Sequence, residues 1–304
     1  MANYETRKYT PSRVTQEASL LLRDVGVVRL DNNGLPRDHL VTNDFPPSDP
    51  WSRHTREVIK GIAAEGRFQN HVVTELGIGD GRNILYAGGG LAGVVGVDID
   101  SWRLDLASYN LRDIAQTTPV EFWEGDAVGL LDQWGRSGER IPGWIIACLP
   151  QSPQAESTAD GYDADSDALA AYREWNVFGL SLNAAVLDKL RQVTYPASRT
   201  LIVLSDRIPP HIKEQLFERT GWDVENVYQT RTPIQQDPDT GIEYVAAYDD
   251  GERFYERRED GFFTPISATE AEKRRIGSMD SGAERAELNV YHHVSLYELS
   301  PIVE

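Results

Sequence analysis

The sequence is short of cysteine, of basic residues and of long apolar runs, and each shortage excludes a class of protein. A single cysteine, Cys148, rules out a disulfide within the chain and a zinc site built on several cysteines. No apolar run reaches the length of about 18 residues that a transmembrane helix needs. The N-terminal residues carry charges with no apolar stretch behind them, so we expect a cytoplasmic protein.

The charge of the chain is strongly acidic. It has 48 Asp and Glu residues against 30 Lys and Arg, which gives a net charge of -18. Such a surface repels phosphate backbones and anionic lipids, so neither nucleic acid nor a membrane is an expected partner. Six histidines include the adjacent pair His292 and His293. Neighbouring residues on a strand point to opposite faces, so we predict no metal site there.

From residue 72 onward, short apolar runs ending in glycine or aspartate alternate with amphipathic stretches. This pattern is typical of β-α-β units around a parallel sheet. The expected strands lie near 72–76, 93–98, 119–124, 143–149, 200–205, 223–230 and 287–299. The expected helices lie near 82–88, 102–115, 127–134, 167–193 and 210–220. The sequence therefore predicts a Rossmann-like, doubly wound α/β fold over residues 71–304.

Residues 1–70 form a separate N-terminal extension with helical patterning. Apolar residues from Val14 to Val25 recur at helical spacing, and a second helix is expected from Ser52 to about Glu65. The sheet alone would leave the crevice at the carboxyl ends of its strands open. We therefore expect this extension to act as a lid over that crevice.

Residues 231–285 interrupt the alternating pattern and are predicted to be an insertion before the last strand. A hairpin is expected from Glu243 to Arg257, with its turn at Asp249-Asp250-Gly251. Ser267 or Thr269 is placed to cap a short charged helix that follows.

A glycine-rich turn follows the first predicted strand and reads Glu75-Leu-Gly77-Ile-Gly79-Asp80-Gly81. Glycines let a backbone approach a ligand closely and adopt the positive φ that a tight turn needs. A dinucleotide fold has a third glycine where this chain has Arg82, and it rarely tolerates an acid like Glu75 ahead of the pyrophosphate. An acid there suits a ligand with an ammonium group, such as the methionine portion of S-adenosylmethionine.

Two more acids stand at the ends of the next predicted strands. Asp98 ends the second strand and can accept hydrogen bonds from both ribose hydroxyls, with Ile99 beside it. Asp126 ends the third strand, followed by Ala127, and can accept from an adenine amino group. Adenosine-containing ligands are therefore expected along these strand ends.

In this order and at these strand ends, the glycine loop and its acids resemble class I methyltransferases, which use S-adenosylmethionine as cofactor. The resemblance covers roughly residues 70–230. It implies a seven-stranded, mostly parallel sheet whose last strand is antiparallel, for which Glu287–Leu299 is the candidate.

The loop after the fourth strand, Cys148-Leu-Pro150-Gln151, is the expected acceptor side of the site. It departs from the Asn-Pro-Pro-Tyr motif of glutamine N-methyltransferases, which argues against methylation of an amide. It is similar to the Cys-Ile-Pro-Gln loop in the methyltransferase portion of plant-type methionine S-methyltransferases. Further short matches follow in the same order, namely Phe178-Gly-Leu-Ser-Leu182, Gln229-Thr-Arg231 and Val290-Tyr291. Gln151 is expected to orient the acceptor, with Cys148 and Pro150 beside it.

That resemblance implies a small, amino-acid-like acceptor, with the thioether sulfur of methionine favoured. A thioether loses no proton when it is methylated and needs no general base. Arg53 and Arg56 are candidates for binding its carboxylate, and Tyr162 for its amine. Trp51 and Trp175 could line the sulfur site. A small-molecule N-methyltransferase and a cofactor-binding protein without turnover remain alternatives.

Overall fold

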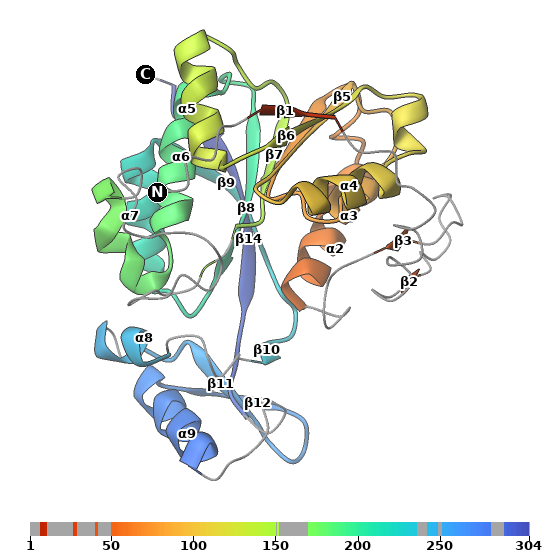
Figure 1. Ribbon diagram of the computed structural model, residues 1–304. Coiled ribbons are helices and arrows are strands. Elements are labelled where there is room, and N and C mark those ends of the chain that lie inside the picture. Colours follow the sequence, from red (N-terminus) through yellow and green to blue (C-terminus); the bar gives the residue numbers. More distant parts are fainter. Residues whose placement is uncertain are drawn as a thin grey trace. The chain divides into compact units, whose positions relative to one another are not determined.

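Apolar runs that end in glycine or an acid form the parallel strands at the centre of the fold (Figure 1). The computed structural model describes residues 7–10, 27–28, 40–41, 50–149, 151, 170–235, 242–248, 251–280 and 289–303. The parallel strands are β4 (Val72–Leu76), β5 (Gly93–Asp98), β6 (Val120–Glu124), β7 (Trp144–Ala147) and β8 (Arg199–Ser205). β4, β7 and β8 are almost wholly buried, which explains why apolar residues predominate in them.

The strand order of the main sheet reverses at β4. The sheet follows the order β1-β6-β5-β4-β7-β8-β14-β9, with β1 at Arg7–Tyr9, β9 at Trp222–Gln229 and β14 at Val294–Pro301. β4 pairs with β5 on one side and with β7 on the other, so the order reverses there. Open α/β sheets bind ligands beyond the carboxyl ends of the strands at such a reversal.

β14 runs antiparallel to its neighbours, as predicted for the last strand. The amide of Asp206, just past β8, donates to the His293 carbonyl at 2.9 Å. The amide of Thr230, just past β9, donates to the Val294 carbonyl at 2.9 Å. The carboxyl ends of β8 and β9 therefore meet the amino end of β14. The single strand predicted over 287–299 is divided between β13 (Tyr291–His292) and β14, which belong to different sheets.

Helices connect the strands close to the predicted positions. They are α2 (Pro50–Ala64), α3 (Arg82–Ala87), α4 (Ser101–Asn110), η2 (Ile114–Gln116), α5 (Ala127–Ser137), α6 (Ser181–Val193) and α7 (Pro210–Thr220). In Figure 1, α2, α3 and α4 lie on one side of β4–β6 and α5 on the other, as a doubly wound fold requires. Asp100 caps α4 by accepting from the Trp102 amide at 2.9 Å, and Gly138 ends α5 with a φ of 77°.

The N-terminal extension contributes a strand as well as the predicted helix α2. β1 pairs antiparallel with β6, and Arg7 lies opposite Glu124. The sheet therefore has eight strands instead of the seven predicted. Two short strands, β2 (Val27–Val28) and β3 (Leu40–Val41), pair with each other. The helix predicted over Val14–Val25 lies outside the described residues.

The chain forms two compact units. The first contains the described residues up to Cys148, together with Gln192–Ile202 and the chain from Glu298 onward. The second contains the described residues of Leu149–Arg191 and Val203–Tyr297. The glycine loop and the carboxyl ends of β4, β5 and β6 all belong to the first unit.

A small second sheet occupies the region predicted to be an insertion. Its strands follow the order β10-β13-β11-β12, with β10 at Ile234–Gln235, β11 at Phe254–Arg257 and β12 at Phe263–Ile266. Two helices, α8 (Ile242–Tyr248) and α9 (Ala268–Asp280), accompany it. A separate cluster of buried residues joins these elements: Ile242, Val245, Phe254, Ala268, Ala271 and Val290.

The hairpin predicted from Glu243 to Arg257 is wrong in its pairing. Residues 242–248 form helix α8, because Ile242, Val245 and Ala246 have helical spacing and pack in the core of the small sheet. β11 pairs instead with β12, further along the chain. The predicted cap of the next helix is confirmed for Ser267, whose Oγ accepts from the Glu270 amide at 3.2 Å.

The long helix predicted over 167–193 is interrupted. A 3₁₀ segment, η3, covers Ala170–Phe178, and α6 starts only at Ser181. Gly179 between them has a φ of 68°, a left-handed conformation that stops a right-handed helix. The Ser181 hydroxyl donates to the Tyr172 carbonyl at 3.0 Å and holds the break.

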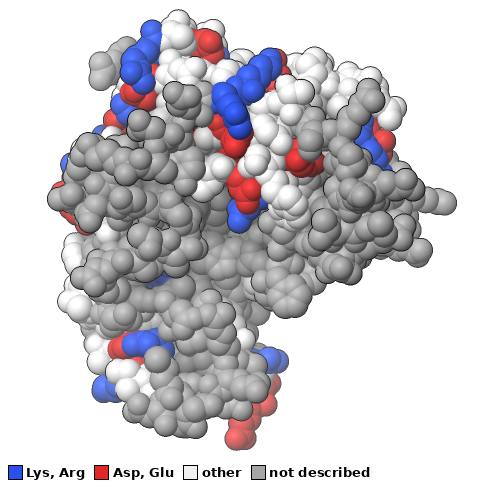
Figure 2. Space-filling model, in the orientation of Figure 1, with Lys and Arg blue, Asp and Glu red and all other residues white. Residues whose placement is uncertain are grey.

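Acidic and basic side chains adjoin one another on the described part of the surface. Figure 2 shows groups of both signs side by side on one face. Ion pairs between exposed side chains include Lys8 with Glu121 at 2.9 Å and Arg136 with Asp132 at 2.7 Å. Among the described helices, none has the length and apolar character needed to cross a membrane.

Candidate functional site

The glycine loop after β4 is held against the end of β5 by backbone hydrogen bonds. The amides of Gly77 and Ile78 both donate to the Val97 carbonyl, each at 2.9 Å. Gly77, Gly79 and Gly81 have φ values of 75°, 55° and 76°. All three adopt the left-handed conformation that side chains disfavour, so the turn depends on glycine at each position.

Two of these glycines face different surroundings. A Cβ added at Gly79 would have nothing within 4 Å, so this backbone borders open space. A Cβ added at Gly81 would lie 3.3 Å from the backbone and side chain of Ala107 and from the side chain of Leu111. Ala107 lies in α4, and Leu111 directly follows that helix. Gly81 therefore permits close packing of α4, whereas Gly79 leaves room that a ligand could fill.

Glu75, the acid that precedes the loop, is fully buried at the end of β4. Its Oε1 accepts a hydrogen bond from Asn83 Nδ2 at 2.7 Å. Its Oε2 is shielded from solvent and has no hydrogen-bond partner among the described residues. Burial raises the pKa of the Glu75 carboxyl well above its usual range; Asn83 lowers it, and Asp80 and Asp98 raise it further. A cationic ligand would stabilise the ionised carboxylate.

Asp98, the acid at the end of β5, is 5% exposed and ties the loop to its own strand. Its Oδ2 accepts from the Gly79 amide at 2.9 Å and its Oδ1 from the Asp100 amide at 3.1 Å. Burial raises the pKa of Asp98, although both of these hydrogen bonds lower it. Each carboxylate oxygen can accept a further hydrogen bond, so the group could also receive ribose hydroxyls. Ile99 next to it is half-buried.

Asp126, at the end of β6, caps helix α5. Its Oδ2 accepts from the Gly129 amide at 2.8 Å and its Oδ1 from the Val128 amide at 3.3 Å. Ala127 is buried in the first turn of the same helix. Capping leaves lone pairs on both oxygens, so acceptance from an adenine amino group stays a prediction.

Polar side chains that the sequence analysis did not select support this arrangement. Asn110, at the end of α4, donates through Nδ2 to the Asp80 carbonyl at 2.8 Å. Asp80 also forms a buried ion pair with Arg82 at 2.7 Å. Asn83, in the first turn of α3, bonds Glu75. Arg82 and Asn83 directly follow the loop, which is the signal that could have identified them.

The predicted acceptor loop is described except at Pro150. Cys148 is half-buried, and its Sγ lies 3.7 Å from Asn83 Nδ2. Gln151 is 8% exposed and belongs to the second unit, where its amide group bridges the backbone of β8. Its Nε2 donates to the Val203 carbonyl, and its Oε1 accepts from the Ser205 amide at 3.1 Å. An orienting role for Gln151 therefore stays a prediction, and Pro150 lies outside the described residues.

The other predicted substrate contacts are placed as follows. Trp51, Arg53 and Arg56 lie on the first turns of α2, where Arg53 is exposed and the other two are half-buried. Trp175 is 5% exposed within η3, and the Arg219 guanidinium lies 5.5 Å from the centre of its ring. Tyr162 lies outside the described residues. Binding of a substrate by this set stays a prediction.

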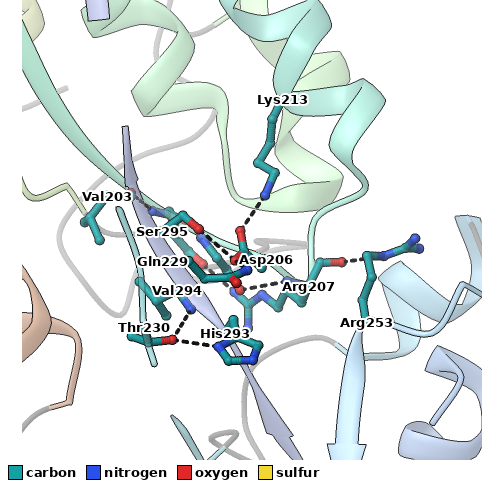
Figure 3. A network of polar contacts seen from close by, with 12 residues as sticks. Val203, Asp206, Arg207, Lys213, Gln229, Thr230, Arg253, His293, Val294 and Ser295 are labelled. Carbon is teal, nitrogen blue, oxygen red and sulfur yellow. Dashed lines mark hydrogen bonds and ion pairs between the residues drawn. The ribbon is translucent and has the colours of Figure 1, made fainter. Parts of the chain in front are cut away.

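A polar network in the second unit joins the end of β8 to β9, β14 and α7 (Figure 3). Asp206 Oδ1 pairs with Lys213 Nζ at 2.6 Å, and Asp206 Oδ2 accepts from Gln229 Nε2 at 2.6 Å and Ser295 Oγ at 2.7 Å. Burial alone would raise the pKa of Asp206, but Lys213 and these hydrogen bonds outweigh it, so the pKa lies below its ordinary value. Arg207 Nη2 donates to the Gln151 carbonyl at 2.9 Å.

The two adjacent histidines lie beside this network and differ in surroundings. Burial lowers the pKa of His292 to about 3. His293 is half-buried, burial lowers its pKa as well, and its Nδ1 lies 2.9 Å from Thr230 Oγ1. Both imidazoles are therefore neutral at pH 7. Among the described residues, no group of three or more His, Cys, Asp or Glu side chains could hold a metal ion.

The strand order, the reversal at β4, the antiparallel β14 and the glycine loop at the reversal together decide the fold. The chain has the fold of class I methyltransferases. The cofactor expected from the sequence is S-adenosylmethionine. The buried, unpartnered Oε2 of Glu75 and the open space at Gly79 fit its ammonium group and its close approach to the loop.

Comparison with known proteins adds one partial sequence match. The chain is 28% identical to the methionine S-methyltransferase of Arabidopsis thaliana over 200 residues, which are 58% of this chain and 18% of the plant protein. This chain thus spans about a fifth of the length of that curated relative. No family model matches the chain.

Similar solved structures include two bacterial proteins described as SAM-dependent methyltransferases, both in complex with S-adenosyl-L-homocysteine. The protein from Geobacter sulfurreducens has a TM-score of 0.42 at 15% identity, covering 81% of this chain and 90% of its own. The protein from Thiobacillus denitrificans also has a TM-score of 0.42 at 15% identity, covering 81% and 91%. With TM-scores this low, the similarity to these structures adds no evidence beyond that of the strand order.

Proposed function

We propose that this protein transfers a methyl group from S-adenosylmethionine to a small, amino-acid-like acceptor. One observation carries the proposal: Glu75 is buried at the strand reversal with an unpartnered Oε2, next to a glycine loop that borders open space at Gly79. A buried acceptor without a partner costs about 1–3 kcal/mol, which a bound ammonium group would recover. Asp98 would receive the ribose hydroxyls and Asp126 the adenine amino group.

The favoured acceptor is the thioether sulfur of methionine or an analogue. Support comes from the Cys148-Leu-Pro-Gln151 loop and from the partial match to a protein named methionine S-methyltransferase. In this reaction a sulfur lone pair forms a bond to the methyl carbon while the bond from that carbon to the cofactor sulfonium breaks. The product is a new sulfonium with S-adenosylhomocysteine, and no proton is released. The protein has to align the two sulfurs and exclude water.

A second candidate is methylation of an amine on a small molecule. An amine must lose a proton when it is methylated, so this reaction would need a proton acceptor that a thioether does not need. In both cases we expect neither nucleic acid nor a membrane as partner, given the net charge of -18.

Transfer of labelled methyl from S-adenosylmethionine to a mixture of amino acids tests the proposal. We expect a labelled product with no net charge at pH 12, because the sulfonium keeps its positive charge and balances the carboxylate, whereas an amino acid methylated once on its amine would have a net charge of −1. Asp98→Ala is the control variant and should lower transfer at least about tenfold through loss of the ribose acceptor. Cofactor binding without transfer to any small molecule would contradict the proposed activity. A labelled product with a net charge of −1 at that pH would select the amine.

A further inference from the structure

Asn83 lies beside the candidate cofactor site, but the glycine-loop pattern does not include it. It occupies the first turn of α3, directly after the loop. Its Nδ2 donates to Glu75 Oε1 at 2.7 Å and lies 3.7 Å from Cys148 Sγ. One side-chain amide therefore connects the acid at the end of β4 with the residue that follows β7. All three residues belong to the first unit.

The same side chain leaves a second buried oxygen without a partner. Asn83 Oδ1 and Glu75 Oε2 are both shielded from solvent, and neither has a hydrogen-bond partner among the described residues. Buried polar atoms of folded proteins are nearly always hydrogen-bonded, so two such atoms on adjoining side chains need a common explanation. An amide oxygen and a carboxylate oxygen are both acceptors, so the missing partner is a donor.

The charges around this pair indicate a cationic donor. Asp80 and Asp98 both act on the Glu75 carboxylate, and the cation nearest in sequence, Arg82, is paired with Asp80. An ammonium group supplies three N–H donors and a positive charge, so one group could serve both oxygens. Burial shifts the unliganded Glu75 toward its uncharged form, and a cationic donor would stabilise the ionised carboxylate, which accepts the stronger, charge-assisted hydrogen bond.

We propose that Asn83 and Glu75 form one binding site for the α-ammonium group of the cofactor, and that Asn83 makes binding depend on the amino-acid portion of that cofactor. The inference rests on the proposed function, since it assumes S-adenosylmethionine as ligand. Asn83 acts in two ways. Its Oδ1 accepts from the ammonium, and its Nδ2 holds Glu75 in the orientation that leaves Oε2 available.

A pair of ligands that differ in the amino-acid portion tests this assignment. S-adenosylhomocysteine carries the α-ammonium, whereas 5′-methylthioadenosine keeps the adenosine and the sulfur but lacks the amino acid. Calorimetry of both ligands should show that Asn83→Ala weakens S-adenosylhomocysteine binding about 10- to 100-fold, the range for loss of a charge-assisted hydrogen bond. Binding of 5′-methylthioadenosine should change less than about twofold.

Asn110→Ala is the matched control, because Asn110 supports the loop through the Asp80 carbonyl and lies on α4. It should weaken both ligands to a similar degree. Asn83→Leu keeps the volume of the side chain without its polar atoms, so it serves as the second variant if Asn83→Ala does not fold. It should show the same selective loss.

The outcomes separate this inference from the proposed function. A selective loss of S-adenosylhomocysteine in either Asn83 variant supports the inference. An equal loss of both ligands would make Asn83 a structural support like Asn110, and an unchanged affinity would remove it from the site; either result overturns the inference while leaving the cofactor assignment intact. If the unaltered protein bound neither ligand, the proposed function itself would fail.

Discussion

Among single residues, two glycines of the loop after β4 serve different purposes, one leaving space for a ligand and the other allowing a helix to pack closely. Gly79 and Gly81 share the left-handed backbone, with φ values of 55° and 76°. Their surroundings separate them, since an added Cβ meets nothing at Gly79 but lies 3.3 Å from Ala107 and Leu111 at Gly81. Binding and stability should therefore respond differently to the same substitution.

Alanine at these two glycines tests that difference. Gly79→Ala should cost about 1–2 kcal/mol of stability for the left-handed backbone alone, and it should lower S-adenosylhomocysteine affinity more than tenfold by filling the open space. Gly81→Ala should lower the free energy of unfolding by more than Gly79→Ala does, because α4 must shift to make room for the Cβ. The folded Gly81→Ala protein should lose less affinity for S-adenosylhomocysteine than the Gly79→Ala protein. Urea unfolding and calorimetry measure the two quantities. Unchanged affinity in Gly79→Ala would place the cofactor elsewhere.

The cofactor-site residues that could be predicted from the sequence are those that stand at the ends of strands. Glu75 and Asp98 each end a parallel strand, and carboxyl ends of parallel strands meet at one edge of the sheet. Asn83 and Asn110 could not be selected in this way. They lie on helices, and their importance comes from hydrogen bonds that only the packed loop brings into range.

Among the elements, the network around Asp206 joins four segments of the second unit. Asp206 follows β8, Lys213 lies on α7, Gln229 ends β9 and Ser295 lies on β14. The carboxylate is mostly buried and accepts from all three. A buried carboxylate with three donors holds its neighbours in place, and removal of one side of such a pair leaves the other charge uncompensated.

Asp206→Ala should therefore lower the free energy of unfolding by about 3–5 kcal/mol. Glu174→Ala is the control in the same unit, because the pair of Glu174 with Arg219 is more than half exposed and should change stability by about 1 kcal/mol or less.

The contribution of Asp206 to stability should also depend on pH. Because folding lowers the pKa of Asp206, this contribution is complete above the unfolded pKa of about 4 and disappears as the pH falls through the folded value. Urea unfolding at pH 7 and pH 3 checks both statements. Equal losses in the two variants would contradict the role assigned to the network.

The two errors in element prediction have different physical causes. Residues 242–248 contain enough β-branched and aromatic residues to suggest a strand, but their apolar side chains meet a core at helical spacing. The helix expected over 167–193 is interrupted because Gly179 adopts a left-handed conformation, which a sequence pattern permits but does not require. Packing in the core of the small sheet therefore decided the first case, and the backbone conformation of Gly179 decided the second.

For the whole molecule, the alternation of strands and helices was enough to predict the fold class. A parallel sheet needs crossover helices, and the glycine loop marks the strand at which the order reverses. The eighth strand was not predictable, because β1 is three residues long and pairs with β6, more than a hundred residues away. Its contacts with β6 include the exposed pairs of Arg7 with Glu124 and Lys8 with Glu121.

Two N-terminal deletions test the lid that the sequence predicts. Deletion of residues 1–10 removes β1, whose exposed ion pairs contribute about 0–1 kcal/mol each, so stability and turnover should change little. Deletion of residues 1–40 should leave S-adenosylhomocysteine affinity within about threefold and abolish methyl transfer, if closure is needed to exclude water. Full transfer by the longer deletion would rule out a lid, and loss in both would assign the effect to the edge strand.

The position of β14 between β8 and β9 has a consequence for biosynthesis. About 65 residues separate Gln229, which ends β9, from Val294, which starts β14. At about 5–20 residues per second, a ribosome needs several seconds to cross that interval, and β9 has no neighbour in the sheet until it has done so. The small sheet with α8 and α9 is encoded within the interval. Its apolar cluster is completed only by Val290, four residues before β14 starts, so the small sheet and the strand that joins β9 to the main sheet leave the ribosome together.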